Sequence, residues 1–133
     1  MSQSNVTRLE KAIEAFNCRD RAAWLAFADP DLENTPPREW PESEPIRGRE
    51  AVWDFYVEAF EPWENGRIGH DEILDGPNGN TLVEVRGEMQ GKASHAGVWW
   101  SFWQVTTFRD EKAIRIRWFA DHAEALEAAG LAE

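Results

Sequence analysis

The chain has 133 residues, the size of one domain with a single hydrophobic core, and its net charge of -11 disfavours nucleic acid as a partner because phosphate groups repel such a surface. Its single cysteine, Cys18, has no disulfide partner within the chain, and no apolar run approaches the ~20 residues that a membrane-spanning helix needs. We therefore expect one domain over residues 1–133 that is cytoplasmic and binds neither membranes nor nucleic acid.

Two helices are predicted at the start of the chain, because apolar residues recur there at three- and four-residue spacing. The first covers residues 6–16, with Ser4 or Asn5 as its N-cap. The second covers residues 22–28. Asp29-Pro30 stops it, because a proline disfavours helical backbone at the residue before it. The first helix is amphipathic, so one of its faces should cover a core.

The next part of the chain is predicted to hold a short strand, a loop and a third helix. Residues 31–35 form the strand. Four prolines and Trp40 make residues 36–45 an irregular loop that is long enough to form the rim of a pocket. The third helix follows Gly48 and is stopped by Pro62.

The second half of the chain is predicted to consist mostly of strands. A weak strand over 67–75 leads into a turn over 75–80, and an alternating pattern marks a strand over 82–89. Residues 122–129 close the chain as a short helix that stops at Gly130.

A β-hairpin lies between these last two elements and is the least ambiguous feature of the sequence. Residues 97–107 are aromatic, β-branched or small, and residues 113–119 alternate with period two. The polar residues 109–112 form the turn, although they include no glycine.

Both faces of the first hairpin strand carry bulky aromatic side chains, so neither face is expected to meet water. Trp100 and Phe102 share one face, and Trp99, Trp103 and Val105 share the other. We expect the chain's own helices to cover one face. A second copy of the sheet should cover the other, which gives a homodimer through the outer sheet face.

The order of the elements predicts an α+β fold, since helices come first and antiparallel strands follow. The expected architecture is a cone-shaped, curved, mostly antiparallel sheet wrapped around three N-terminal helices, with a short C-terminal helix. The open end of such a cone is a natural pocket.

Eight tryptophans are many for a chain of this length. They fit core or interface packing on the one hand and a pocket walled by indole rings on the other. An apolar pocket selects a small, flat or cyclic organic ligand over a sugar phosphate or a nucleotide. The side chains expected to bind this ligand are Trp24, Trp40, Phe55, Tyr56, Trp100, Phe102, Gln104 and Trp118.

Four stretches carry a family resemblance: IRGREAVWDFY (46–56), EILDGPNGNTLVEVRGEMQGKAS (72–94), QVTTFRDEKAIRIRWFAD (104–121) and AEALEAAGL (123–131). In them the chain resembles the SnoaL-like branch of the nuclear-transport-factor-2-like superfamily, which includes ketosteroid isomerase, scytalone dehydratase and limonene-epoxide hydrolase. The resemblance covers nearly the whole chain and implies the cone-shaped fold. It implies no single reaction, because members catalyse unrelated reactions or none.

The active sites of two related enzyme classes match this chain only in part. The steroid isomerases have a catalytic tyrosine on the first helix, where this chain has none, and their general base falls on Thr35, Pro36 or Glu39 depending on the alignment. The Arg-x-Asp pair of the epoxide hydrolases resembles Arg86-Gly87-Glu88, but their last-strand aspartate falls at Trp118.

The SnoaL-type cyclases offer a closer match, since they use an aspartate near the end of the last strand with a polar partner on the neighbouring strand. Asp121, with Gln104 or His95, resembles this pair. The resemblance thus implies acid/base catalysis in a cyclisation, isomerisation, dehydration or hydrolysis, with Asp121 as the first candidate and His95, Gln104 or Glu39 as its helper. Asp121 also directly precedes residues 122–129, where a carboxylate would cap a helix.

No metal and no other cofactor is expected, because the three histidines lack metal-ligand spacing and one cysteine cannot complete a site. The sequence leaves two functions open. One is a cofactor-free enzyme acting on an apolar organic substrate, and the other is a non-catalytic domain that binds a ligand or dimerises.

Overall fold

The computed structural model describes residues 4–41, 43–61, 64–90 and 98–132. Within these residues the helices are α1 (Asn5–Asn17), α2 (Arg21–Phe27), α3 (Arg49–Phe60) and α4 (His122–Ala129). The strands are β1 (Ala28–Thr35), β2 (Ile46–Arg47), β3 (Glu64–His70), β4 (Leu74–Asp75), β5 (Asn80–Gln90), β6 (Val98–Arg109) and β7 (Lys112–Phe119). A single 3-10 turn, Pro77–Gly79, precedes β5.

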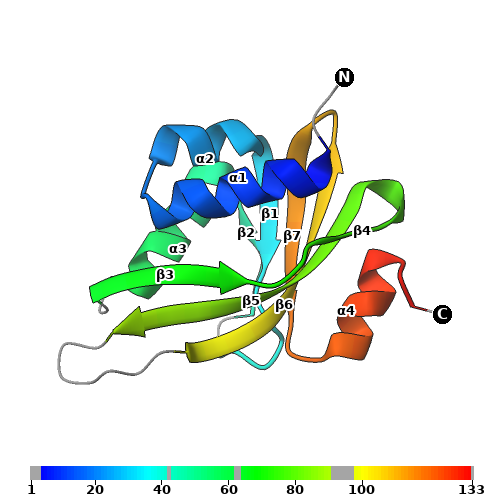
Figure 1. Ribbon diagram of the computed structural model, residues 1–133. Helices are drawn as coiled ribbons and strands as arrows, with labels where there is room; N and C mark the ends of the chain where they lie inside the picture. Colours follow the sequence, from blue (N-terminus) through cyan, green and yellow to red (C-terminus); the bar gives the residue numbers. More distant parts are fainter. Residues whose placement is uncertain (1–3, 42, 62–63, 91–97, 133) are drawn as a thin grey trace.

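The strands form one mixed sheet in the order β2-β1-β7-β6-β5-β3, with β4 paired to β5. β1 pairs with β7 in parallel, and the other described pairs are antiparallel. Helices α1, α2 and α3 lie on one side of the sheet and α4 lies on the other (Figure 1). This arrangement confirms the predicted α+β cone with a mostly antiparallel sheet.

Local sequence signals set the ends of the helices. Ser4 caps α1, because its hydroxyl accepts a hydrogen bond from the backbone N–H of Thr7 at 3.1 Å. Gly48 precedes α3 with a φ of 97°, and Gly130 ends α4 with a φ of 78°. Both backbone conformations favour glycine, which explains why the two glycines mark helix boundaries in the sequence.

The main core fills the space between the three N-terminal helices and the inner face of the sheet. Phe16 of α1, Trp24 of α2 and Trp53 of α3 are at most 5% exposed, and Trp53 has its ring beside each of the other two. Val83 and Val85 of β5 are buried on the inner face of the sheet. The period-two pattern of β5 therefore directs one set of side chains into the cone.

The outer face of the sheet is covered by α4. Leu82 of β5 and Val105 of β6 are fully buried against two alanines of this helix. Trp103 of β6 stacks on His122 at the start of α4, with ring centroids 3.8 Å apart and ring planes 7° apart. Among the described residues, Leu74 is the one large apolar side chain that is exposed.

This cover corrects the reasoning behind the predicted homodimer. Of the three residues expected to form an exposed apolar patch, Val105 is buried and Trp103 is half-buried within the chain itself. The side chain of Trp99 lies outside the described part of the structure. The homodimer stays a prediction, but it no longer has the exposed patch on which it rested.

The hairpin between β6 and β7 turns through two residues, Asp110 and Glu111. Their φ angles are 51° and 68°, the combination that a two-residue type I′ turn requires. Glycine would adopt it more easily, and contacts with distant residues hold the turn in its place. Arg8 of α1 pairs with Glu111 at 2.9 Å, and Lys112 donates to the carbonyl of Ala26 at 2.5 Å.

Two predicted strands differ from the observed ones in their limits. β1 begins at Ala28, three residues before the predicted start, because it pairs from there with Ala113 of the distant β7. The strand expected over 67–75 is two strands, β3 and β4, and Ile73 between them is buried in the core. In both cases tertiary pairing overrides the local sequence signal.

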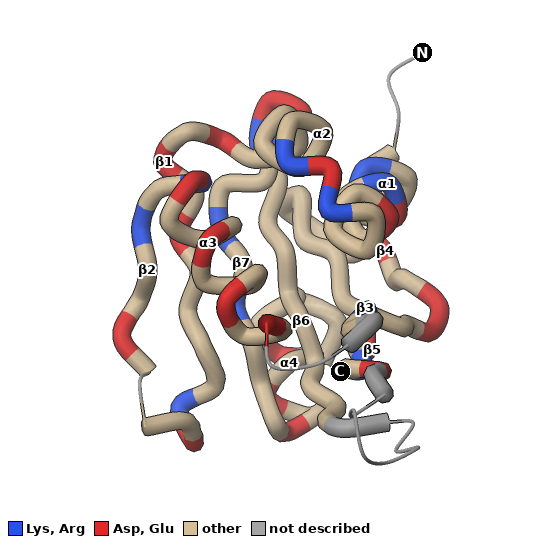
Figure 2. Tube along the Cα trace, turned by 90° about the vertical axis from the view of Figure 1, so that its left-hand side faces the viewer, with Lys and Arg blue, Asp and Glu red and all other residues tan. Residues whose placement is uncertain are grey.

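Charged residues of both signs are spread along the described trace (Figure 2). Acidic residues outnumber basic ones by 25 to 14, so the field around the molecule is negative. No helix in the described part of the chain has the length and apolarity to cross a membrane.

Candidate functional site

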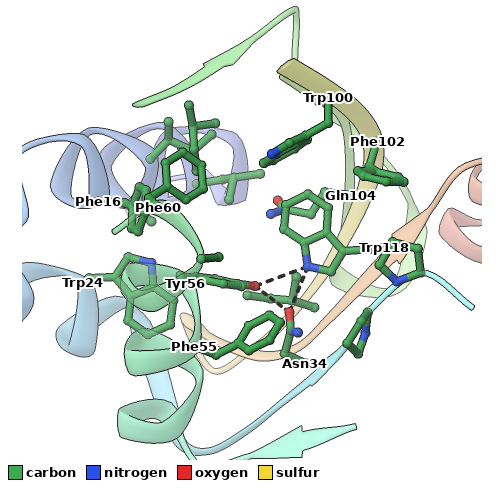
Figure 3. Close-up of a pocket in the computed structure, with 18 of the residues that line it drawn as sticks. Phe16, Trp24, Asn34, Phe55, Tyr56, Phe60, Trp100, Phe102, Gln104 and Trp118 are labelled. Carbon is green, nitrogen blue, oxygen red and sulfur yellow. Dashed lines mark hydrogen bonds between the residues drawn. The ribbon is translucent and has the colours of Figure 1, made fainter. Parts of the chain in front are cut away.

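A cavity opens inside the cone, between helices α1 to α3 and the inner face of the sheet (Figure 3). Its volume is about 80 Å³, several times the ~10–15 Å³ that one water molecule needs. Helix α1 contributes Leu9, Ala12, Ile13 and Phe16 to its wall, and α3 contributes Phe55, Tyr56, Ala59 and Phe60.

Strands β1, β3, β6 and β7 and the loop after β1 complete the wall of the cavity. On β6, Trp100, Phe102 and Gln104 stand two residues apart and therefore share the inner face. Trp40, from the loop after β1, meets Phe102 edge to face with ring centroids 5.5 Å apart. The ring of Trp40 thus lies at the wall as the proline-rich loop was predicted to place it.

The structure brings together all eight side chains that the sequence predicted as ligand contacts. They are Trp24, Trp40, Phe55, Tyr56, Trp100, Phe102, Gln104 and Trp118, and each lies on the wall of this one cavity. On β6, the face that carries Trp100, Phe102 and Gln104 points inward.

Polar groups on the described wall gather mainly at one place, which we call the polar corner: Asn34 of β1, Tyr56 of α3 and Trp118 of β7. The Tyr56 hydroxyl donates to Asn34 Oδ1 at 2.5 Å, and Trp118 Nε1 donates to the same oxygen at 2.9 Å. Trp118 Nε1 also lies 3.3 Å from the Tyr56 hydroxyl oxygen. The three side chains thus fix one another (Figure 3).

The hydrogen bonds of the polar corner determine how the Asn34 amide is oriented. An indole N–H can only donate, so the atom of Asn34 that faces Trp118 must be the amide oxygen. The amide nitrogen Nδ2 therefore points away from both partners. It is buried, and it has no hydrogen-bond partner among the described residues.

Burial raises the pKa of the Tyr56 phenol far above its usual range, against the opposing effect of the hydrogen bond with Trp118. The phenol therefore stays neutral at physiological pH and acts as a hydrogen-bond donor to Asn34. Desolvation is the dominant cause, since the ring packs among Phe16, Trp24 and Trp118.

Gln104 adds a second amide to the wall of the cavity. Its side chain is 6% exposed and points into the space beside Trp100 and Trp118 (Figure 3). Its Oε1 accepts a hydrogen bond from the hydroxyl of Thr106 at 3.1 Å, so its amide nitrogen is the end left to meet a ligand.

The candidate catalytic residues do not gather at this cavity. Asp121 is exposed and caps α4, because its Oδ2 accepts a hydrogen bond from the backbone N–H of Glu124 at 3.2 Å. Glu39 is exposed on the surface and pairs with Arg38 at 3.5 Å. His95 lies outside the described residues.

The described wall of the cavity contains neither a carboxylate nor a histidine, and its ionisable group is the Tyr56 phenol. In the same described residues, no three His, Cys, Asp or Glu side chains come together as a metal site would need. The chemistry on offer is therefore neutral hydrogen bonding from two amides, one phenol and indole N–H groups within an apolar wall.

Sequence reasoning missed Asn34 because an asparagine reads as a surface or turn residue. A signal was present, since Leu32 and Asn34 stand two residues apart and share one strand face. Both are fully buried. A polar residue on the buried face of a strand needs hydrogen-bond partners, and Tyr56 and Trp118 provide them.

Comparison with known proteins places this architecture in a family. The sequence model of the SnoaL-like domain matches residues 9–116. A search of curated proteins finds no match. Among solved structures, an NTF2-like protein of unknown function from Burkholderia pseudomallei is 20% identical, with a TM-score of 0.72 over 96% of this chain and 98% of that one.

Two further solved structures with the same fold hold cyclic organic molecules. TerC, crystallised with polyporic acid, is 19% identical, with a TM-score of 0.71 over 94% of this chain and 96% of its own. Rv0760c of Mycobacterium tuberculosis, in complex with estradiol-17β-hemisuccinate, is 14% identical, with a TM-score of 0.70 over 90% of this chain and 96% of its own. Because the family model matches most of its length, the chain belongs to the SnoaL-like family.

Proposed function

We propose that this protein binds a small, mainly apolar organic molecule in the cavity of its cone. The observation that carries the proposal is the cavity itself, a space of about 80 Å³ with aromatic and aliphatic walls and a few polar groups. Sites for small organic ligands have this composition, because apolar walls supply affinity and a few polar groups fix orientation. The eight side chains predicted from the sequence are the proposed ligand contacts.

The ligands of related structures support this proposal. TerC and Rv0760c share the fold and were crystallised with cyclic organic molecules. At under a fifth identity, each supports the class of ligand and not its identity. A flat or cyclic molecule also suits walls in which rings such as Trp100 and Trp118 meet edge to face, with centroids 6.2 Å apart.

The described residues favour ligand binding without acid/base catalysis. Proton transfer needs a carboxylate, a histidine or a similar group within hydrogen-bond reach of the ligand. On the described wall that role falls to the Tyr56 phenol alone, and burial keeps it protonated. Asp121 and Glu39 make their contacts at the surface, so neither enters our proposal.

Ligand titration of a matched pair of variants tests the proposal. Ala59 lies on the cavity wall, and Ala51 is exposed on the same helix, α3. Ala59→Leu places three more carbons in the cavity, whereas Ala51→Leu adds the same atoms at the surface. Tryptophan fluorescence reports binding, since Trp24, Trp40 and Trp100 all line the cavity.

We expect saturable quenching by at least one class in a panel of terpenoids, steroids and aromatic polyketides. Ala59→Leu should weaken that binding about tenfold or more, because overfilling a packed site costs on the order of 1–3 kcal/mol. Ala51→Leu should leave it unchanged. If no class gives saturable quenching, or if both variants bind like the wild type, the cavity is not the ligand site.

A further inference from the structure

We propose that the ligand is a neutral molecule that presents a ketone-type carbonyl oxygen to the amide nitrogen of Asn34. This inference rests on the proposed function, and it names the ligand's chemistry rather than its mere presence. It comes from the polar corner, where the structure leaves a buried hydrogen-bond donor without a partner.

The unpartnered donor is a feature of the cavity wall. Asn34 is fully buried and lies on the wall, and its Nδ2 atom has no partner among the described residues. The amide cannot relieve this by flipping, because its nitrogen would then face the N–H of Trp118 at 2.9 Å. A buried donor left unpaired is costly, so an acceptor supplied by a ligand would recover that cost.

The surroundings favour a carbonyl over a hydroxyl group at this position. Asn34 Oδ1 already accepts two hydrogen bonds, from the Tyr56 hydroxyl and from Trp118 Nε1. Both lone pairs of that oxygen are therefore used. A ligand hydroxyl would bring a donor of its own to a corner whose amide oxygen cannot accept it, whereas a carbonyl oxygen only accepts.

The charges around the cavity favour a neutral ligand over an anion. No lysine and no arginine lies among the described residues of the wall. A carboxylate taken into this space would lose its hydration without gaining a cation there. The net charge of -11 also opposes the approach of an anion.

Three compounds on one ring system test both parts of the inference on the wild-type protein. 1-Acetonaphthone carries a neutral carbonyl, 1-ethylnaphthalene has nearly the same shape without an acceptor, and 1-naphthoate carries a carboxylate. We expect the ketone to bind roughly 3- to 10-fold more tightly than the ethyl compound, the range of one buried hydrogen bond. The carboxylate should bind at least about tenfold more weakly than the ketone.

A pair of variants then assigns the preference to one atom. Asn34→Asp keeps the oxygen that accepts from Tyr56 and Trp118 but replaces the amide nitrogen by an oxygen, so the ketone should lose its advantage over the ethyl compound. Thr81→Val is the matched control. Thr81 is a fully buried polar residue of β5 that donates to the carbonyl of Thr106 at 3.3 Å and lies outside the described wall. This control should keep the full preference for the ketone.

The outcomes separate this inference from the proposed function. Equal binding of the ketone and the ethyl compound, or a preference that persists in Asn34→Asp, overturns the role of Asn34 while ligand binding stands. Equal binding of 1-naphthoate and the ketone overturns the neutral class. Binding of none of the three overturns this inference, and the proposed function falls with it if no class of the wider panel binds either. Should Asn34→Asp fail to fold, the wild-type comparison still decides.

Discussion

The polar corner predicts that the effect of Tyr56→Phe on stability depends on the residue at position 34. Tyr56→Phe removes the hydroxyl that donates to Asn34 Oδ1 at 2.5 Å. The oxygen keeps its second hydrogen bond, from Trp118 at 2.9 Å, so the substitution strands no acceptor. The free energy of unfolding should therefore fall by about 0.5–1.5 kcal/mol, the net contribution of a typical hydrogen bond.

The same substitution should have a different effect once Asn34 is replaced. In an Asn34→Leu background the Tyr56 hydroxyl is a buried donor that has lost its acceptor. Its remaining contact, with Trp118 at 3.3 Å, is one in which the indole N–H is the donor. Tyr56→Phe then removes this unsatisfied donor and also the remaining acceptor of Trp118 Nε1, so its cost should differ from its cost in the presence of Asn34. The coupling energy between the two positions should be on the order of 1 kcal/mol.

Urea denaturation of the wild type, both single variants and the double variant measures this coupling. The transitions can be followed by the fluorescence of the eight tryptophans, and the free energies come from linear extrapolation. An equal cost of Tyr56→Phe in both backgrounds would refute the hydrogen-bonded corner, since it would show that the hydroxyl acts independently of Asn34.

Two further predictions concern a phenol and a helix cap. Tyr56 is the single tyrosine of the chain, and burial raises its pKa, so the folded protein should show no tyrosinate absorbance near pH ~11, where the unfolded chain has titrated. The raised pKa of Tyr56 contributes stability that is fully present below the unfolded pKa of ~10 and is lost as the pH rises toward the folded pKa. Above pH ~10 the wild type should therefore lose stability more steeply than Tyr56→Phe. Tyrosinate absorbance in the folded protein near pH ~10 would contradict this prediction. Asp121→Ala should lower the free energy of unfolding by about 0.5–2 kcal/mol, whereas Asp121→Asn should preserve it, because asparagine caps a helix as well as aspartate does. Both Asp121 variants should keep wild-type affinity for ligand in a fluorescence titration, and a loss of affinity in either would place Asp121 at the site after all.

The fold could be predicted from the sequence because its elements follow strong periodic patterns. Val83 and Val85 alternate with charged residues and enter the core, as the period-two pattern indicated. The aromatic residues of β6 were correctly divided into two faces for the same reason. What the pattern does not contain is the position of α4, which buries Val105 on the outer face. That position depends on how the chain turns after β7, beyond the reach of local periodicity.

The candidate site was predictable in its apolar part and missed in its polar part. The aromatic side chains predicted as ligand contacts lie on the wall of the cavity, because large rings are buried both in a core and in a pocket. The resemblance directed attention to carboxylates and to His95, whereas Asn34 pairs with Tyr56 and Trp118 across long separations in sequence. Such a triad has no short motif that a sequence could display.

The measurement that tests the central claim most directly is a crystal structure of the protein with 1-acetonaphthone. We expect the naphthalene rings to lie in the cone cavity beside Trp100 and Trp118, with the carbonyl oxygen about 3 Å from Asn34 Nδ2. A cavity filled by the protein's own side chains, with the ligand elsewhere on the surface, would contradict it.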